Sequence, residues 1–122
     1  MNTDADTTLS ELKDRIRAFS KARDWEQFHA PKNLAMALAA EVGELMERFL
    51  WIEVEESRCL CDDPVKRAEV ADELADVLIY ALRFADVAGL DATEAILQKM
   101  ARNEERYPVE KAKGSSVKYD EL

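Results

Sequence analysis

Residues 64–88 read PVKRAEVADELADVLIYALRFADVA. Asp63 and Pro64 form a start signal for a helix, and Gly89 directly after the run is a stop signal. Between them, apolar residues recur every three or four positions, which predicts one amphipathic helix that ends at about Ala88. The side chains expected to face the core lie on one stripe of this helix: Val70, Leu74, Val77, Leu78, Ala81 and Phe84.

Three more helices are predicted, over residues 9–23, 31–55 and 91–107. Thr8 and Glu11 form a capping box for the first of them, and Pro31 suits the first turn of the second. Asp91 and Glu94 mark the start of the last. Four helices with short connections and no alternating strand pattern predict an all-α, four-helix-bundle-like fold.

Composition restricts the class of protein. The chain has 122 residues, 48% hydrophobic and 35% charged, so we expect one globular domain over residues 1–122, with tails at 1–6 and about 109–122. With a net charge of −9, the chain lacks the basic surface expected of a duplex nucleic-acid binder, and it is repelled by anionic membranes. A polyphosphate ligand would therefore need a cation between it and the protein.

The two cysteines, Cys59 and Cys61, are one residue apart and form no disulfide framework. No apolar leader follows Met1, and no apolar stretch is long enough to span a bilayer. These features predict a cytoplasmic protein.

Two pairs of carboxylates lie at the margin of the predicted core. Glu41 and Glu44 lie at one margin of the apolar stripe of the second helix, and Glu73 and Asp76 lie at one margin of that of the long helix. Three or four positions away from these four residues, the only basic residue is Arg48, near Glu44. Such carboxylates repel one another and need a partner, which suggests a hard cation such as Mg²⁺ or Mn²⁺. The stripe of the second helix consists of Leu34, Leu38, Val42, Leu45, Phe49 and Ile52.

From spacing alone, other interpretations of these carboxylates stay open. A chain with 26 acidic residues contains such pairs by chance, as ordinary solvated charges. A non-catalytic acidic module that dimerises through its helices is a second interpretation. A di-iron bundle is disfavoured, because no histidine follows either acidic pair at the usual spacing.

The order and spacing of several segments are more specific. Glu41-x-x-Glu44 and Glu73-x-x-Asp76, with 28 residues between them, resemble the metal signature of the MazG-like all-α nucleotide pyrophosphohydrolases. Further segments over residues 9–122 resemble the dCTP pyrophosphatase branch of that family: RDWEQFH at 23–29, PKNL at 31–34, Trp51, Lys99-Met100, Asn103, RYP at 106–108 and Lys118-Tyr119.

This resemblance implies Mg²⁺-dependent hydrolysis of a nucleoside triphosphate to the monophosphate and pyrophosphate, as house-cleaning of the nucleotide pool. It implies that the chain assembles as a homodimer or a dimer-of-dimers tetramer, with Glu41, Glu44, Glu73 and Asp76 as metal ligands. Glu41 or Glu44 is the expected base for the attacking water. The chain departs from the animal dCTP enzymes at Ile16, where they carry a histidine, so the preferred base stays open.

Candidate substrate-binding residues are also predicted. Trp25 and Trp51 could stack on a base, although packing in the core or an interface is equally expected of them. Tyr80 could bond a sugar or phosphate, or be a core tyrosine with a solvated hydroxyl. The only histidine, His29, is otherwise typical of a loop or a cap.

Basic and polar residues near the C-terminus complete the predicted set. Lys99, Asn103 and Tyr107 recur on one side of the last helix and could contact phosphates, or form a solvated basic face. Lys111 and Lys118 could close over the triphosphate, with disorder as the alternative.

Overall fold

The computed structural model describes residues 2–122 and contains helices but no strand in that range. It divides into two compact units, one that ends at Gly89 and one that spans Leu90–Leu122. The first unit contains α1 (Leu9–Ala22), η1 (Glu26–Phe28), α2 (Pro31–Glu47), α3 (Val54–Ser57), η2 (Leu60–Asp62) and α4 (Pro64–Val87). The second contains α5 (Ala92–Arg106), α6 (Val109–Ala112) and η3 (Tyr119–Glu121). The predicted all-α class is confirmed.

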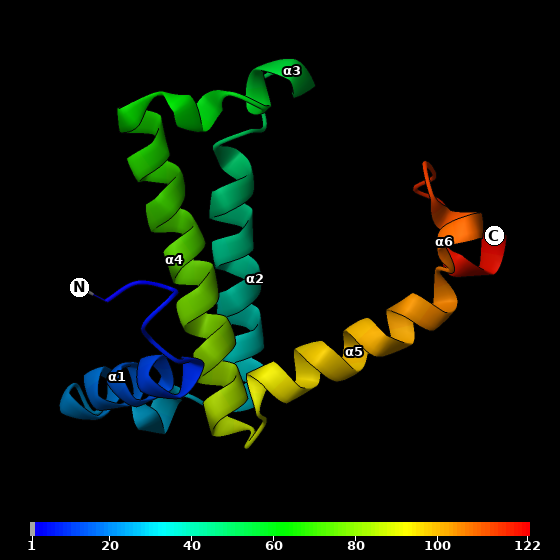
Figure 1. Cartoon of the computed structure of the whole chain (residues 1–122). Coiled ribbons are helices and arrows are strands. Elements are labelled where there is room, and N and C mark those ends of the chain that lie inside the picture. The colour runs from blue at the N-terminus through cyan, green and yellow to red at the C-terminus, as the bar shows by residue number, and fades with distance from the viewer. Residues whose placement is uncertain (1) are drawn as a thin grey trace. The chain divides into compact units, whose positions relative to one another are not determined.

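The first unit is built on a pair of long helices. Figure 1 shows α2 and α4 side by side, joined at one end through α3 and η2, with α1 beside the C-terminal part of α4. Leu34 of α2 and Ala85 of α4 are the buried apolar residues of the described chain, and Leu34 is only 1% exposed. Because α2 and α4 pack side by side, the two predicted acidic pairs lie on neighbouring helices.

Side-chain caps begin three of the helices at the predicted places. The capping box of α1 is complete, since Thr8 accepts from the Glu11 N–H and Glu11 accepts from the Thr8 N–H. Asp63 caps α4 through the Lys66 N–H at 2.9 Å, and Asp91 caps α5. These caps satisfy N–H groups that have no partner within the first turn of a helix.

The predicted second helix, residues 31–55, is too long. α2 ends at Glu47, and the chain turns through N–H bonds from Phe49 to Met46 and from Ile52 to Phe49 before α3 begins at Val54. The apolar spacing continues through this segment. Its aromatic and β-branched residues have a lower helix propensity, because their side chains lose rotational freedom in a helix. Periodicity alone therefore placed the end of this helix wrongly.

The predicted tails hold local structure. Near the N-terminus, the Thr3 N–H donates to Asp6 Oδ1 at 2.6 Å and closes a turn before α1. Near the C-terminus, α6 and η3 lie within residues 109–122. The Tyr107 and Tyr119 rings make an edge-to-face contact, with centroids 6.1 Å apart. A single domain over the whole chain stays a prediction.

Three positions of the predicted core stripes are exposed in the single chain: Val42, Leu74 and Leu78. Val42 and Leu74 line an apolar hollow of about 480 Å³ between α2 and α4, together with Leu45, Met46, Phe49 and Val70. We call this surface the apolar face. The prediction that these three side chains are buried is wrong for the chain by itself. Within residues 2–122, no helix has the length and apolar character needed to cross a membrane.

Candidate active site

Three of the four predicted carboxylates converge between α2 and α4. Glu41, Glu73 and Asp76 each offer an oxygen, and these oxygens lie within 4.8 Å of one another. Glu41 and Glu73 are half-buried, whereas Asp76 is exposed. Glu44, one turn beyond Glu41, is exposed at the side of this group. The packing of the two long helices thus creates the acidic cluster that the sequence predicts.

The electrostatics of the cluster are unfavourable without a cation. Glu41 Oε2 is buried and has no hydrogen-bond partner among the described residues. The negative charge of Glu41, with a smaller contribution from Glu73, raises the pKa of Glu44 above its usual value. A buried acceptor without a donor costs about 1–3 kcal/mol.

Arg48 relieves part of this repulsion from the neighbouring turn. Its Nη2 lies 3.1 Å from Glu73 Oε1, and its Nη1 lies 3.3 Å from Glu69 Oε2. The sequence associates Arg48 with Glu44 on its own helix, but the ion pairs cross to α4. They leave Glu41 without a cationic partner among the described residues, so the cluster still fits a bound metal ion.

The chemistry of the donors also fits a metal. All three converging groups are carboxylates, and hard divalent cations prefer oxygen ligands. Glu41 Oε2 is an acceptor already removed from water, as a ligand atom in a partly enclosed site must be. Glu41, Glu73 and Asp76 would hold the ion, with Glu44 beside them.

Two adjoining cavities lie between the connector that follows α1 and the long helices. One, of about 330 Å³, is lined by Trp25, Phe28, His29, Asn33, Leu34, Ala37 and Tyr80. The other, of about 250 Å³, is lined by Ile16, Phe19, Ser20, Trp25, His29, Asp76, Ile79, Tyr80 and Arg83. Trp25, His29 and Tyr80, all predicted to bind substrate, line both. An aromatic lining with a few polar groups is typical of a site for a small organic ligand.

Trp25 is positioned by the way α1 ends. Asp24 adopts a positive φ of 55°, the Asp24 N–H donates to the Lys21 carbonyl, and the Trp25 N–H donates to the Ser20 carbonyl. These two bonds form a Schellman motif. The Trp25 ring then contacts Phe19 edge to face, with centroids 5.7 Å apart. The indole is thus held at the wall of both cavities.

The smaller cavity connects the aromatic residues to the acidic cluster. Asp76 belongs both to the cluster and to the lining of this cavity. Ile16, where the sequence resemblance leads us to expect a departure from the animal dCTP enzymes, lines the same cavity. A ligand in the cavity would therefore touch Ile16 at one side and lie next to Asp76 of the acidic cluster at another.

The remaining predicted residues lie elsewhere in the chain. Trp51 is in the turn after α2, is 90% exposed, and lines neither cavity. The other five belong to the second unit, where Lys99 and Asn103 lie on α5, Tyr107 follows α5, Lys111 lies on α6 and Lys118 precedes η3. Their contacts with substrate stay predictions.

Arg83 is a residue at this site that the sequence analysis did not single out. It lies on α4, lines the smaller cavity, and its Nε donates to His29 Nδ1 at 3.0 Å. The only signal in the sequence is a cation within the otherwise apolar run VLIYALRFA at 77–85.

The fold and the cluster together define an all-α protein with a carboxylate site suited to metal and a neighbouring aromatic cavity. Residues 36–122 match the MazG-like family, and the chain belongs to that family. It is 42% identical to dCTP pyrophosphatase 1 of Bos taurus over 97% of this chain and 70% of that protein. It is 44% identical to dCTP pyrophosphatase 1 of Homo sapiens over 94% of this chain and 68% of that protein.

A solved structure supports the same assignment. A pyrophosphatase from Archaeoglobus fulgidus superposes with a TM-score of 0.78 at 38% sequence identity, covering 88% of this chain and 99% of that one. The family predicted from the acidic signature and its surrounding segments is therefore confirmed.

Proposed function

We propose that this chain hydrolyses dCTP, or a dCTP with a modified base, to the monophosphate and pyrophosphate in a reaction that depends on Mg²⁺. The observation that carries the proposal is the position of Asp76, which joins the acidic cluster to the aromatic cavity. A base in the cavity would direct its triphosphate toward the cluster. The names of the relatives support pyrophosphohydrolysis and cytosine as the base.

The residues have distinct roles in this proposal. Glu41, Glu73 and Asp76, with Glu44 beside them, would hold the metal, which when bound would screen the polyphosphate charge and lower the pKa of the attacking water. Trp25 stacks on the base, and Tyr80 bounds the cavity on the side of α4. Glu41 and Glu44 are the candidates to accept the proton of the water, because Glu41 belongs to the acidic cluster and Glu44 lies at its side.

The choice of Mg²⁺ follows from the ligands. Carboxylate oxygens without histidine or cysteine favour Mg²⁺ or Mn²⁺ over zinc. Mg²⁺ is also the usual partner of nucleoside polyphosphates. Mn²⁺ should substitute for it, because the same oxygen ligands bind both ions.

The experiment is a panel of nucleoside triphosphates with Mg²⁺, resolved for monophosphate, diphosphate, pyrophosphate and phosphate. Monophosphate and pyrophosphate, released fastest from dCTP, are the expected products. Diphosphate and phosphate as main products would contradict attack at the α-phosphorus. Glu41→Gln and Asp76→Asn should abolish turnover, whereas Glu47→Gln and Asp72→Asn are matched controls on the same helices.

Self-association is a second part of the proposal. The apolar face exposes Val42, Met46 and Leu74 on the two helices that carry the acidic cluster. Soluble monomers rarely expose a contiguous apolar surface of this kind. A second copy of the chain that covers this face would bury it and produce the homodimer, or a tetramer made of two such dimers.

A further inference from the structure

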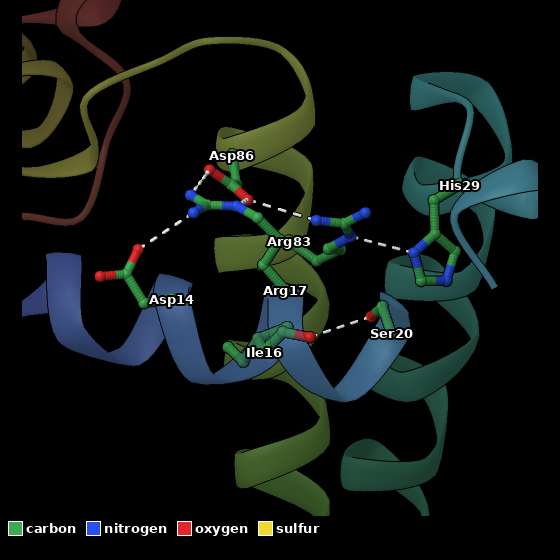
Figure 2. A network of polar contacts seen from close by, with 7 residues as sticks. All are labelled: Asp14, Ile16, Arg17, Ser20, His29, Arg83 and Asp86. Atoms are coloured by element: carbon green, nitrogen blue, oxygen red, sulfur yellow. Dashed lines mark hydrogen bonds and ion pairs between the residues drawn. The ribbon is translucent and has the colours of Figure 1, made fainter. Parts of the chain in front are cut away.

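Arg83 is an ionised side chain buried inside the first unit. Its side chain is only 6% exposed, although an unpaired buried charge is strongly unfavourable. It has two partners, since Nη1 lies 3.2 Å from Asp86 Oδ2 and Nε lies 3.0 Å from His29 Nδ1 (Figure 2). The guanidinium plane is thus held between a carboxylate on its own helix and an imidazole from the connector before α2.

A second arginine holds Asp86 in place. Arg17 of α1 donates to both carboxylate oxygens, from Nε to Oδ2 at 2.8 Å and from Nη2 to Oδ1 at 2.6 Å. Its Nη1 also bonds Asp14 at 3.1 Å. Bidentate arginine–carboxylate pairs have a defined geometry. The network in Figure 2 therefore runs from α1 through α4 to His29, and it fixes the orientation of Arg83.

The bond from Arg83 determines where His29 carries its proton. Arginine keeps its proton in proteins and can only donate, so Nδ1 of His29 must be the acceptor. The imidazole is then neutral, with its hydrogen on Nε2. Burial, and then the charge of Arg83, lower the pKa of His29, and the opposing charge of Glu26 is the smaller influence.

The protonated nitrogen is directed away from the network. In Figure 2 the imidazole turns Nδ1 toward Arg83 and Nε2 to the opposite side. Among residues 2–122, no side chain is hydrogen-bonded to Nε2, and His29 lines both cavities with Trp25 and Tyr80. The cavity walls thus include one N–H donor with a fixed position and a fixed protonation state.

We propose that Arg83 is a positioning residue that holds His29 as an Nε2–H donor to an acceptor atom on the base of the substrate. The inference rests on the proposed function, because it takes the cavity as the site of the base. A fixed N–H donor favours a base whose hydrogen-bonding edge carries an unprotonated ring nitrogen, such as N3 of cytosine. It disfavours thymine and uracil, whose N3 carries a hydrogen and would meet the donor with another donor.

The tautomer can be measured without any turnover. His29 is the only histidine in the chain, so imidazole ¹⁵N resonances of the uniformly labelled protein report on it alone. We expect at neutral pH an unprotonated Nδ1 and a protonated Nε2. A protonated Nδ1, or a cationic ring, would overturn the proposal even if the enzyme hydrolyses dCTP. Conversely, the expected tautomer in a protein without pyrophosphohydrolase activity would reject the proposed function and the recognition of the base, and would retain only the effect of Arg83 on the tautomer of His29.

Substitution of Arg83 tests the link to specificity. Arg83→Leu should give a mixture of tautomers and raise KM for dCTP about 3- to 10-fold with little change in kcat, since one hydrogen bond of the bound base is lost. The preference for dCTP over dTTP should fall by a similar factor. Arg67→Leu removes the same charge from the exposed first turn of α4 and should change neither quantity. An unchanged tautomer or an unchanged preference in Arg83→Leu would refute the assignment.

A titration of the wild-type protein keeps the proposal testable if Arg83→Leu does not fold. The non-hydrolysable α,β-imido analogue of dCTP, added with Mg²⁺, should shift the Nε2–H resonance of His29. The corresponding analogue of dTTP at equal saturation should shift it much less. Equal shifts with both analogues would show that His29 does not read the base and would overturn the proposal.

Discussion

Among single residues, Glu41 best connects the fold to the proposed chemistry. Its carboxylate is held between α2 and α4 by the packing of both helices, and one of its oxygens has no donor in the described chain. Under the proposed function, metal binding accounts for an arrangement that weakens the metal-free fold, as is common at sites that bind cations or reacting groups.

Glu41→Gln should stabilise the metal-free protein and abolish its response to Mg²⁺. The amide removes one negative charge from the cluster and can donate to a neighbouring carboxylate, so we expect a gain of about 1 kcal/mol in the free energy of unfolding. Tm should rise by a few degrees without Mg²⁺, about 4–8 °C per kcal/mol for a small domain. Wild type should show a rise in Tm with Mg²⁺ that the variant lacks, because only the native cluster binds the ion.

Glu47→Gln on the same helix is the control and should retain the response to Mg²⁺. An equal Mg²⁺-induced rise in wild type and Glu41→Gln would show that the ion binds elsewhere.

Asp86 predicts a dependence of stability on pH. The hydrogen bond from Arg17 lowers the pKa of Asp86 below its usual value of 3.8, burial opposes this, and the charge of Arg17 adds to it. A lowered pKa means that the unfolded state binds the proton more readily. The stabilisation is therefore complete above about pH 3.8 and is lost as the pH falls through the lower value of the folded protein.

Asp86→Asn should thus lower Tm at neutral pH and have a progressively smaller effect below pH 3.8. The expected loss at neutral pH is about 1.5–3 kcal/mol, typical of a hydrogen bond to a charged group. Asp14→Asn, at the exposed side of Arg17, is the matched control and should change Tm little at any pH. A difference between wild type and Asp86→Asn that is constant down to acid pH would contradict this account.

At the level of elements, the end of α1 decides where Trp25 lies. The Schellman motif requires a left-handed residue at Asp24, and aspartate tolerates that region better than most residues with a side chain. The Asp24 carboxylate also accepts from Gln27 Nε2 at 3.1 Å, which ties the start of η1 to the turn.

Substitutions at Asp24 should separate backbone strain from charge. Asp24→Asn keeps the acceptor and the tolerance for positive φ, and should change the free energy of unfolding by less than about 0.5 kcal/mol. Asp24→Val should destabilise the protein by about 1–2 kcal/mol and alter the near-ultraviolet circular dichroism of Trp25, because a β-branched residue is strained there. Urea unfolding measures the free energy of unfolding of each variant. Equal stability of the two variants would argue against the motif.

The sequence predicted those elements whose signals are local. The starts of α1, α4 and α5 agree with their caps, since Thr8, Asp63 and Asp91 bond N–H groups three residues away. The end of α2 could not be read from periodicity, because the apolar spacing persists through a segment of poor helix formers.

Contacts between distant residues limit what the sequence reveals of the site. Helical spacing predicted that Glu41, Glu73 and Asp76 lie at the margins of the apolar stripes of their own helices, and their convergence needed only the pairing of the two helices. The bond between Arg83 and His29 joins residues 54 positions apart, and no periodic pattern specifies it. The same holds for the ion pair from Arg48 to Glu73, which local spacing assigned to the wrong glutamate.

For the whole molecule, the apolar face raises the question of what covers it. Val42, Met46 and Leu74 are exposed apolar side chains on α2 and α4, the two helices whose carboxylates form the acidic cluster. A polar substitution there would act first on assembly, and then on the site through the packing of α2 against α4. Under the proposed self-association, the single chain is only part of the stable unit.

The proposed self-association through the apolar face predicts that Met46→Glu converts the protein from a dimer or larger assembly to a monomer with a lower Tm. A charge at the centre of a buried apolar contact is desolvated without a partner, and each protomer in a symmetric dimer contributes one such charge. Light scattering after size exclusion measures the mass, and metal-dependent turnover shows whether the site requires the assembly. Val65→Lys alters an exposed apolar residue of α4 outside the apolar face and should preserve the mass of the wild type. A wild-type protein that is monomeric at micromolar concentration, with Met46→Glu equally stable, would mean that this face stays exposed and serves no contact between copies.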